Sequence, residues 1–169
     1  MGITIEKARP EDAAELLEYL KIVGSETDNL SFGAEGLPFA LEEEQQYLTS
    51  LQGSTTSAMF IAKKDGKIIG TADFRGNTRD RLKHRGEMGI SLVKAEWGKG
   101  VGKKLMESVI EFAKTEAQAE IISLEVRSDN IRAIKLYEKY GFEKIGHFEG
   151  YMKVDGQLVA CDFMKLSLF

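Results

Sequence analysis

Three glycines at alternate positions, Gly98, Gly100 and Gly102, constrain the fold of this chain more than any other feature. They follow a β-rich run at residues 87–93. An apolar stripe of helical spacing comes next, formed by Val101, Leu105, Val109 and Phe112. Glycines at a helix start let backbone N–H groups turn towards a bound anion without interference from a Cβ, and the helix dipole favours negative charge there. The stretch therefore predicts a strand, a glycine turn and a helix that together bind a pyrophosphate-sized ligand.

The spacing of the glycines narrows the choice of ligand. A Walker A loop is excluded, because Trp97 and Lys104 occupy its first and last defined positions, and the dinucleotide fingerprint fails because residue 103 is lysine. The pattern Arg/Gln-x-x-Gly-x-Gly/Ala fits Gly100 and Gly102, with Trp97 in place of the usual Arg or Gln. It resembles the acetyl-CoA loop of the GCN5-related N-acetyltransferase (GNAT) superfamily. The resemblance implies that acetyl-CoA is held by the amides of Gly98, Lys99, Gly100, Val101, Gly102 and Lys103.

A second motif follows, in which Asn130, Ala133, Tyr137, Gly141 and Phe142 match the superfamily pattern Asn-x-x-Ala-x-x-x-Tyr-x-x-x-Gly-Phe. The resemblance implies that Asn130 binds the pantetheine arm of acetyl-CoA and that the hydroxyl of Tyr137 lies near its sulfur. Taken alone, Asn130 is equally well explained as a helix N-cap and Tyr137 as a core aromatic.

The expected order of elements is β-α-α-β-β-β-α-β-α-β-β, which predicts an α/β (α+β) fold with a mixed, mostly antiparallel sheet and helices on both faces. This is also the order of the superfamily. The expected strands are residues 3–9, 57–64, 67–74, 87–93, 122–126, 142–153 and 157–168, and the expected helices are residues 10–20, 41–51, 101–117 and 130–140. We expect residues 1–169 to form a single domain. Glu42, Glu43 and Glu44 are interpreted as a solvated first helical turn.

Composition limits the partners. A net charge of −4 and a pI near 5.4 give no basic field for nucleic acid, and no stretch approaches the length of about 20 apolar residues that crosses a membrane. The single cysteine, Cys161, forms no internal disulfide and suits a reducing, cytoplasmic location. A homodimer is compatible with the sequence, and no metal site is expected.

The chemistry implied by the resemblance is acyl transfer from a thioester to an amine. A strand-end amide at Leu92 or Val93 is expected to polarise the thioester carbonyl, and Tyr137 to protonate the departing thiolate. Glu87 is the predicted general base, acting directly or through water. Its alternative interpretation is a strand-end carboxylate paired with a cation, and the other residues considered for this role are His84, Glu125 and His147. Cys161 is interpreted as a core residue rather than an acyl carrier.

The sequence leaves the function open between three classes of protein. The predicted one is an acetyl-CoA-dependent N-acetyltransferase acting on a primary amine, with a small molecule such as an amino acid favoured over a protein N-terminus, a lysine or a polyamine. The others are a non-catalytic acetyl-CoA-binding module and a nucleotide-binding regulatory domain. The acidic loop at residues 24–38 and the basic loop at residues 75–85 are both expected to line the acceptor pocket.

Overall fold

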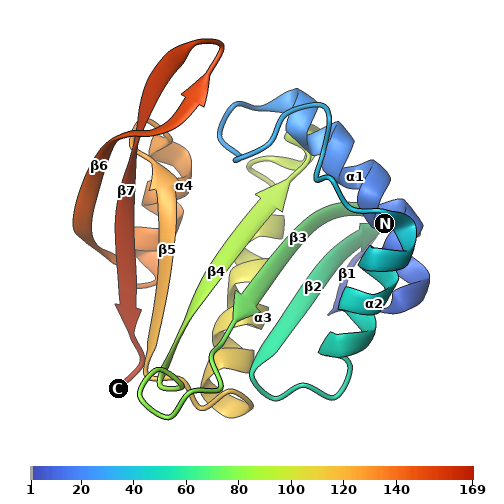
Figure 1. The fold of residues 1–169 in the computed structure, drawn as a ribbon, viewed down its shortest axis with the longest axis horizontal. Coiled ribbons are helices and arrows are strands. Elements are labelled where there is room, and N and C mark those ends of the chain that lie inside the picture. Colours follow the sequence, from blue (N-terminus) through green and yellow to red (C-terminus); the bar gives the residue numbers. More distant parts are fainter. Residues whose placement is uncertain (1) are drawn as a thin grey trace.

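The computed structural model describes residues 2–169 and places four helices around a seven-stranded sheet (Figure 1). The strands are β1 (Ile3–Lys7), β2 (Ser57–Lys64), β3 (Lys67–Arg75), β4 (Arg85–Leu92), β5 (Ile121–Arg127), β6 (Glu143–Val154) and β7 (Gln157–Ser167). The helices are α1 (Ala13–Glu26), α2 (Leu41–Leu51), α3 (Val101–Thr115) and α4 (Ile131–Lys139). The predicted order of elements and the mostly antiparallel sheet are confirmed, and most boundaries lie within two residues of those expected.

The sheet opens in its middle. Its strands lie in the order β1-β2-β3-β4-β5-β7-β6, and every neighbouring pair is antiparallel except β4 and β5, which are parallel. These two strands pair only where Arg85–Glu87 meets Ile121–Ser123. Beyond that point they spread apart, as Figure 1 shows. The backbone groups that face the gap therefore have no strand partner and are available to a ligand.

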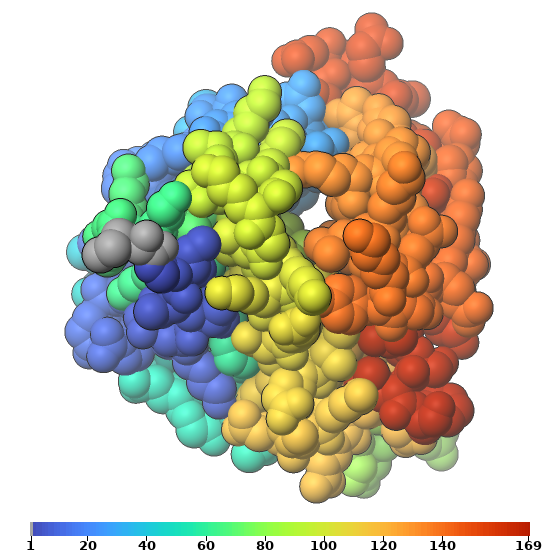
Figure 2. All heavy atoms as spheres, turned by 180° about the vertical axis from the view of Figure 1, so that it is seen from behind, coloured from blue at the N-terminus to red at the C-terminus, as the bar shows by residue number. Residues whose placement is uncertain are grey.

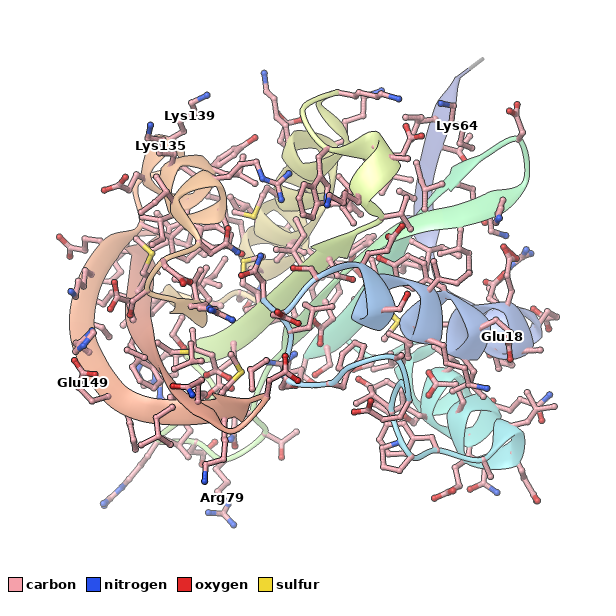
Figure 3. All side chains as sticks on the ribbon, turned by 90° about the horizontal axis from the view of Figure 1, so that it is seen from above. Glu18, Lys64, Arg79, Lys135, Lys139 and Glu149 are labelled. Atoms are coloured by element: carbon pink, nitrogen blue, oxygen red, sulfur yellow. The ribbon has the colours of Figure 1, made fainter. Side chains whose placement is uncertain are left out.

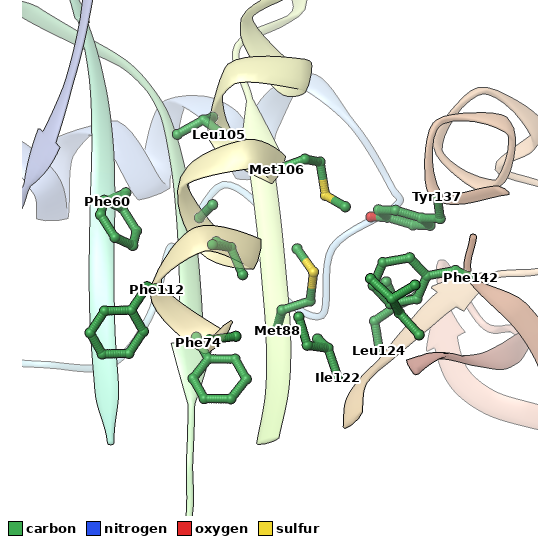
Figure 4. Packing of buried hydrophobic residues seen from close by; sticks show 14 of the residues in the cluster. Phe60, Phe74, Met88, Leu105, Met106, Phe112, Ile122, Leu124, Tyr137 and Phe142 are labelled. Carbon is green, nitrogen blue, oxygen red and sulfur yellow. The ribbon is translucent and has the colours of Figure 1, made fainter. Parts of the chain in front are cut away.

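Helix α3 is anchored to one face of the sheet by the predicted apolar stripe. Val101, Leu105, Val109 and Phe112 are all at most 2% exposed. The ring of Phe112 packs against Phe60 and Phe74, with centroid distances of 6.2 and 6.1 Å (Figure 4). Each large apolar side chain buried in this way stabilises the fold by roughly 1.5–3 kcal/mol. This packing holds the N-terminus of α3, and with it the glycine turn, beside the gap.

Helices α1 and α2 cover the opposite face of the sheet (Figure 1). Their apolar residues form a second core with β2 and β3, which includes Leu16, Val23, Leu48, Ile61 and Ile68. Helix α1 continues to Glu26, so the following loop spans residues 27–40 rather than beginning at Gly24 as expected. The loop folds back against α1 at Gly24, where an added Cβ would lie 2.0 Å from the carbonyl oxygen of Gly33. Glycine at position 24 thus allows the close approach that brings this loop over the sheet.

Candidate active site

A continuous cleft of about 1630 Å³ passes through the gap between β4 and β5. Figure 2 shows it from behind as an opening between the yellow segment of α3 and the orange segment of β5 and α4. Its lining divides into two parts. The turn half is formed by residues 97–103 and α4, and the loop half is formed by α1, residues 27–40, α2 and the strand residues that face them.

The glycine turn has the geometry of an anion site. Gly98 and Gly100 have φ angles of 76° and 86°, a region that favours glycine, and an added Cβ on either would meet no atom within 4 Å. Helix α3 begins without a side-chain cap, and the first amide bonded back to the turn is that of Lys104, 3.3 Å from the carbonyl oxygen of Gly100. The three preceding amides of the helix therefore have no acceptor among residues 2–169. A pyrophosphate fits this cradle.

The predicted residues of the glycine turn differ in whether their side chains or only their backbone amides can reach a ligand. Gly98, Gly100, Gly102 and Lys103 line the cleft. Lys99 does not line the cleft, and its exposed ammonium lies 3.8 Å from the carboxylate of Glu96. Val101 is 1% exposed, so its side chain belongs to the core and only its amide remains for a ligand.

Cations gather on the turn half. Lys103, Arg132, Lys135 and Lys139 line it with one carboxylate, that of Glu107. Figure 3 shows Lys135 and Lys139 extending outward from α4 at the rim. This distribution suits a polyanionic ligand and contrasts with the overall negative charge of the chain.

Trp97, which stands where the family pattern has Arg or Gln, connects the two sides of the gap. Its Nε1 donates to the carbonyl oxygen of Leu92 at 2.9 Å, which ties the indole to the end of β4. The guanidinium carbon of Arg132 lies 3.5 Å from its ring centroid, a close cation–π arrangement. The stack holds a positive charge beside the glycine turn, although residue 97 itself is neutral.

The end of β4 leaves one of the two predicted amides free. The Val93 N–H donates to the carbonyl oxygen of Ile69 at 2.9 Å and is therefore engaged with the β3 side. Successive amides of a strand point to opposite edges, so that of Leu92 faces the β5 side, where the strands have separated. Leu92 also lines the cleft, whereas Val93 does not.

The second motif places its two predicted ligand-binding residues on the cleft. Tyr137 is 6% exposed, and its hydroxyl points from α4 towards Met106 and β4 (Figure 4). Burial raises the pKa of Tyr137 far above its ordinary value, so the hydroxyl stays protonated at neutral pH. The Oδ1 of Asn130 accepts from the Ala133 amide at 3.3 Å and caps α4, which leaves the carboxamide N–H groups without an acceptor among the described residues. Asn130 thus has the capping role and still offers donors to a ligand.

Glu87 lies at a distance from the free strand end. Its side chain is exposed and does not line the cleft, and its carboxylate lies 3.8 Å from the Arg75 guanidinium. At about 3.3 Å per residue, its Cα is roughly 17 Å along the strand from that of Leu92, so any proton transfer needs intervening water. Asp73, which the sequence did not single out, is closer. It lines the cleft, accepts from the Gly89 amide at 3.0 Å and bonds to Arg75, and burial raises the pKa of its carboxyl.

Three further hydroxyls meet beside the end of β4. Ser91 lies 2.8 Å from the Tyr19 hydroxyl and 2.9 Å from that of Thr71, oxygen to oxygen. Ser91 and Thr71 line the loop half of the cleft. Single hydroxyl residues separated by many positions carry no signature in a sequence, which is why this group was not predicted.

Two expectations about the loop half are wrong. Within the basic loop only Arg75 lines the cleft. Residues 76–84 join the end of β3 to the start of β4, at the end of β4 that lies away from Leu92. Glu44 is not solvated with its neighbours but is 4% exposed. Its position one helical turn before the buried Leu48 was a signal of burial that the run of three acids concealed.

The other residues considered as bases divide between the cleft and its surroundings. Glu125 lines the cleft. Cys161, which was weighed as an acyl carrier and interpreted as a core residue, also lines it, and burial raises the pKa of its thiol, which suits an inert residue. His147 does not line it. Its Nδ1 lies 2.7 Å from Asp162 of β7, and its Nε2 lies 2.9 Å from Glu149 of its own strand. Both contacts raise the pKa of the imidazole, and the first joins β6 to β7. His84 lies in the loop before β4, at the end of that strand away from Leu92.

Comparisons with known proteins agree with this geometry. The model of the acetyltransferase (GNAT) family matches residues 26–142. An uncharacterized N-acetyltransferase of Bacillus licheniformis is 31% identical over 110 residues, which cover 65% of this chain and 61% of that protein. An L-amino acid N-acetyltransferase of Escherichia coli is 34% identical over 105 residues, which cover 62% of this chain and 64% of that protein. The chain thus spans less than two thirds of the length of these two curated relatives.

A solved structure extends the likeness over the whole chain. The crystal structure of an acetyltransferase of the GNAT family from Streptococcus pneumoniae superposes with a TM-score of 0.94 and 30% sequence identity, covering 99% of this chain and 100% of that one. Within residues 2–169, no helix is both long enough and apolar enough to cross a membrane. The fold, the glycine turn and the matched family model lead to one conclusion: the chain belongs to the acetyltransferase (GNAT) family.

Proposed function

We propose that this protein is an acetyl-CoA-dependent N-acetyltransferase that moves the acetyl group to the primary amine of a small molecule by direct attack. One observation carries the proposal. The uncapped glycine-turn N-terminus of α3 opens into the same cleft as the loop half, through the separation of β4 from β5. A thioester bound from one side therefore meets an amine bound from the other side without a covalent enzyme intermediate.

Acetyl-CoA is the acyl donor used by the family, and the residues of the turn half suit its anionic and amide groups. The amides from Gly98 to Lys103 bind the pyrophosphate, and the lysines and Arg132 surround it with positive charge. The free carboxamide N–H of Asn130 donates to the pantetheine arm. The amide of Leu92 donates to the thioester carbonyl oxygen, where negative charge develops as the amine attacks.

Proton transfers on both sides of the reaction complete the proposal. The attacking ammonium loses a proton to Asp73, whose raised pKa suits a general base. Glu87, which is paired with Arg75, takes part in proton transfer only through water. The amine nitrogen bonds to the acetyl carbon, the C–S bond breaks, and the sulfur receives the proton of the Tyr137 hydroxyl. The nitrogen then loses its second proton, which returns to Tyr137 through water and restores the hydroxyl. Because Tyr137 remains protonated, it is always ready to act as this acid.

The loop half favours a small acceptor, because residues 27–32 line it together with α1 and α2 and enclose a pocket. The L-amino acid N-acetyltransferase of Escherichia coli is a relative whose name gives a small molecule as its acceptor. A single domain over residues 1–169, a cytoplasmic location and a homodimer stay predictions.

Thiol release from acetyl-CoA, measured with a panel of primary amines, tests the proposal. We expect CoA release that requires an amine, and thermal stabilisation by CoA but not by ATP or NAD. A ligand at 100 times its Kd stabilises by about 2.7 kcal/mol, a shift that is readily measured. Stabilisation by CoA without thiol release from any amine would instead indicate the non-catalytic binding module.

A further inference from the structure

Glu44 of α2 is a buried acid with nothing to neutralise it. It is 4% exposed and lines the loop half of the cleft, yet its carboxylate makes no hydrogen bond or ion pair with any residue from 2 to 169. Its neighbours differ. Glu42 is exposed, and Glu43 accepts from the Ala40 amide at 2.9 Å, where it caps the helix. No buried side-chain oxygen among residues 2–169 lacks a partner, so the unpaired Glu44 oxygens are open to the cleft although the rest of the residue is buried. An unpaired carboxylate that faces a largely apolar cleft is a binding site for a cationic group of a ligand.

The surroundings of Glu44 are apolar on one side and aromatic on the other. Leu16, Leu20 and Met59 line the same half of the cleft, and Tyr47 follows one helical turn later. Burial raises the pKa of the Glu44 carboxyl. Burial also raises the pKa of Tyr47, and the charges of Asp73 and Glu44 add to the effect, so Tyr47 lies within electrostatic range of both acids.

The arginines of the loop half are already occupied. Arg75 bonds to Asp73 and lies 3.8 Å from Glu87. Arg127 bonds to both carboxylate oxygens of Asp129, at 2.7 and 3.1 Å, and to the carbonyl oxygen of Asp28 at 3.2 Å. The charge of each guanidinium is therefore already balanced by a carboxylate of the protein. The unsatisfied charge on this side of the cleft is negative.

We infer that Glu44 receives a second, non-reacting positive charge of the acceptor, which is therefore a diamine or polyamine with an apolar stem. The reacting amine lies near the end of β4, and the stem passes Tyr47 and Met59 to reach the carboxylate. This inference rests on the proposed function for the reacting end of the acceptor. Within the small-molecule class, it favours dications over α-amino acids with neutral side chains.

Two acceptors with the same five-carbon chain test the inference, 1,5-diaminopentane with two charges and pentylamine with one. Selectivity is the ratio of their kcat/KM values in thiol release, and binding is measured separately by calorimetry with the protein bound to CoA. A hydrogen-bonded charge pair of this kind corresponds to a preference of about 10- to 100-fold for the diamine. Glu44→Gln is expected to abolish the preference, and Glu44→Asp to retain part of it. The matched control, Glu42→Gln, makes the same charge change on the exposed face and should keep the preference in full.

The outcomes separate the inference from the proposed function. If wild type does not prefer the diamine, or if Glu44→Gln keeps the preference, the inference is wrong while acetyl transfer stands. If no amine releases CoA but the diamine binds in a manner that depends on Glu44, the proposed function fails, and of the inference only the binding of a cation by Glu44 holds. If the wild-type protein neither releases CoA with any amine nor binds the diamine, the proposed function and the inference about Glu44 are both refuted. The wild-type arm can refute the inference even if Glu44→Gln does not fold, and Glu44→Asp then tests whether the preference depends on this carboxylate.

Discussion

The two halves of the cleft achieve recognition by opposite means. The turn half uses main-chain amides and flanking cations, drawn from two continuous segments at residues 97–103 and 130–140. The loop half uses side chains from α1, α2 and several strands, and its acids outnumber its arginines. A backbone cradle tolerates side-chain replacement and suits a co-substrate that is always the same. A site built from side chains changes with single substitutions and suits the partner that varies among related enzymes.

The largest effect is expected where the halves meet. Tyr137→Phe keeps the ring, which packs with its centroid 5.8 Å from that of Phe142, and removes only the hydroxyl. If that hydroxyl protonates the thiolate, turnover should fall by roughly 10²–10⁴-fold. Acetyl-CoA affinity, measured by calorimetry, should stay nearly constant. Wild-type turnover in this variant would return Tyr137 to the role of a core aromatic.

Gly100→Val tests whether the turn half depends on its backbone. A valine at a φ of 86° strains the turn and covers the open amides, so acetyl-CoA affinity should fall by at least about 10²-fold. Gly53→Val is the matched control, because Gly53 has a φ of 74°, also faces open space and lies in the turn after α2. The control should lose thermal stability alone. Equal acetyl-CoA affinity in the two variants would remove the glycine turn from the binding site.

Asp73, which lines the cleft, and Glu87, which lies outside it, should together control the pH profile. Asp73→Asn is expected to lower kcat/KM at pH 7 by about tenfold or more, with partial recovery as pH rises, because solution then supplies free amine. Glu87→Gln should show the same pattern with a smaller loss, since Glu87 lies outside the cleft and acts through water. Profiles recorded from pH 6 to pH 10 distinguish the two carboxylates. If both variants overlay wild type, the base lies elsewhere, with Glu125 the next residue to test.

Arg132→Ala measures what the cation–π stack adds to the backbone cradle. The guanidinium lies 3.5 Å from the Trp97 centroid, and its loss should weaken acetyl-CoA binding by roughly fivefold, as expected for one partly exposed cation. The weakening should shrink at high salt. Arg132→Lys keeps the charge and loses the planar stack, so it separates the two contributions. An unchanged dissociation constant in the Ala variant would show that the amides suffice.

The smallest effect concerns stability. Because burial raises the pKa of Glu44 above its ordinary value of 4.5, the folded state binds this proton more tightly than the unfolded chain does. The charged carboxylate therefore destabilises the fold increasingly as pH rises above that value. Glu44→Gln should be more stable than wild type by about 1 kcal/mol at pH 7, and the difference should vanish near pH 4. Thermal unfolding across this range provides the measurement, and a variant less stable than wild type at pH 7 would identify a structural role for Glu44.

The same contrast explains what the sequence could and could not predict. The residues of the turn half belong to short sequence motifs, so Gly100, Asn130 and Tyr137 could each be assigned a position and a predicted role. The loop half depends on pairs far apart in the chain, such as Tyr19 with Ser91 and Arg127 with Asp28, which are 72 and 99 residues apart. No local spacing specifies such contacts, because they follow from how the helices pack on the sheet.

Glu87 shows an intermediate case. The sequence correctly placed it on the central strand, and the rise per residue already implied its distance from Leu92. What the sequence lacked was its neighbour. Only the pairing of β3 with β4 sets Arg75 opposite Glu87 and brings Asp73, rather than Glu87, to the cleft.

The separation of β4 from β5 gives this sheet two internal edges besides its outer ones. An unpaired edge on the outside of a protein attracts other strands and promotes aggregation. These internal edges instead face the cleft, whose lining residues come from both sides of the gap. We expect an extended chain that carries amide groups to bond to the unpaired backbone of the gap, as another strand would bond to an outer edge.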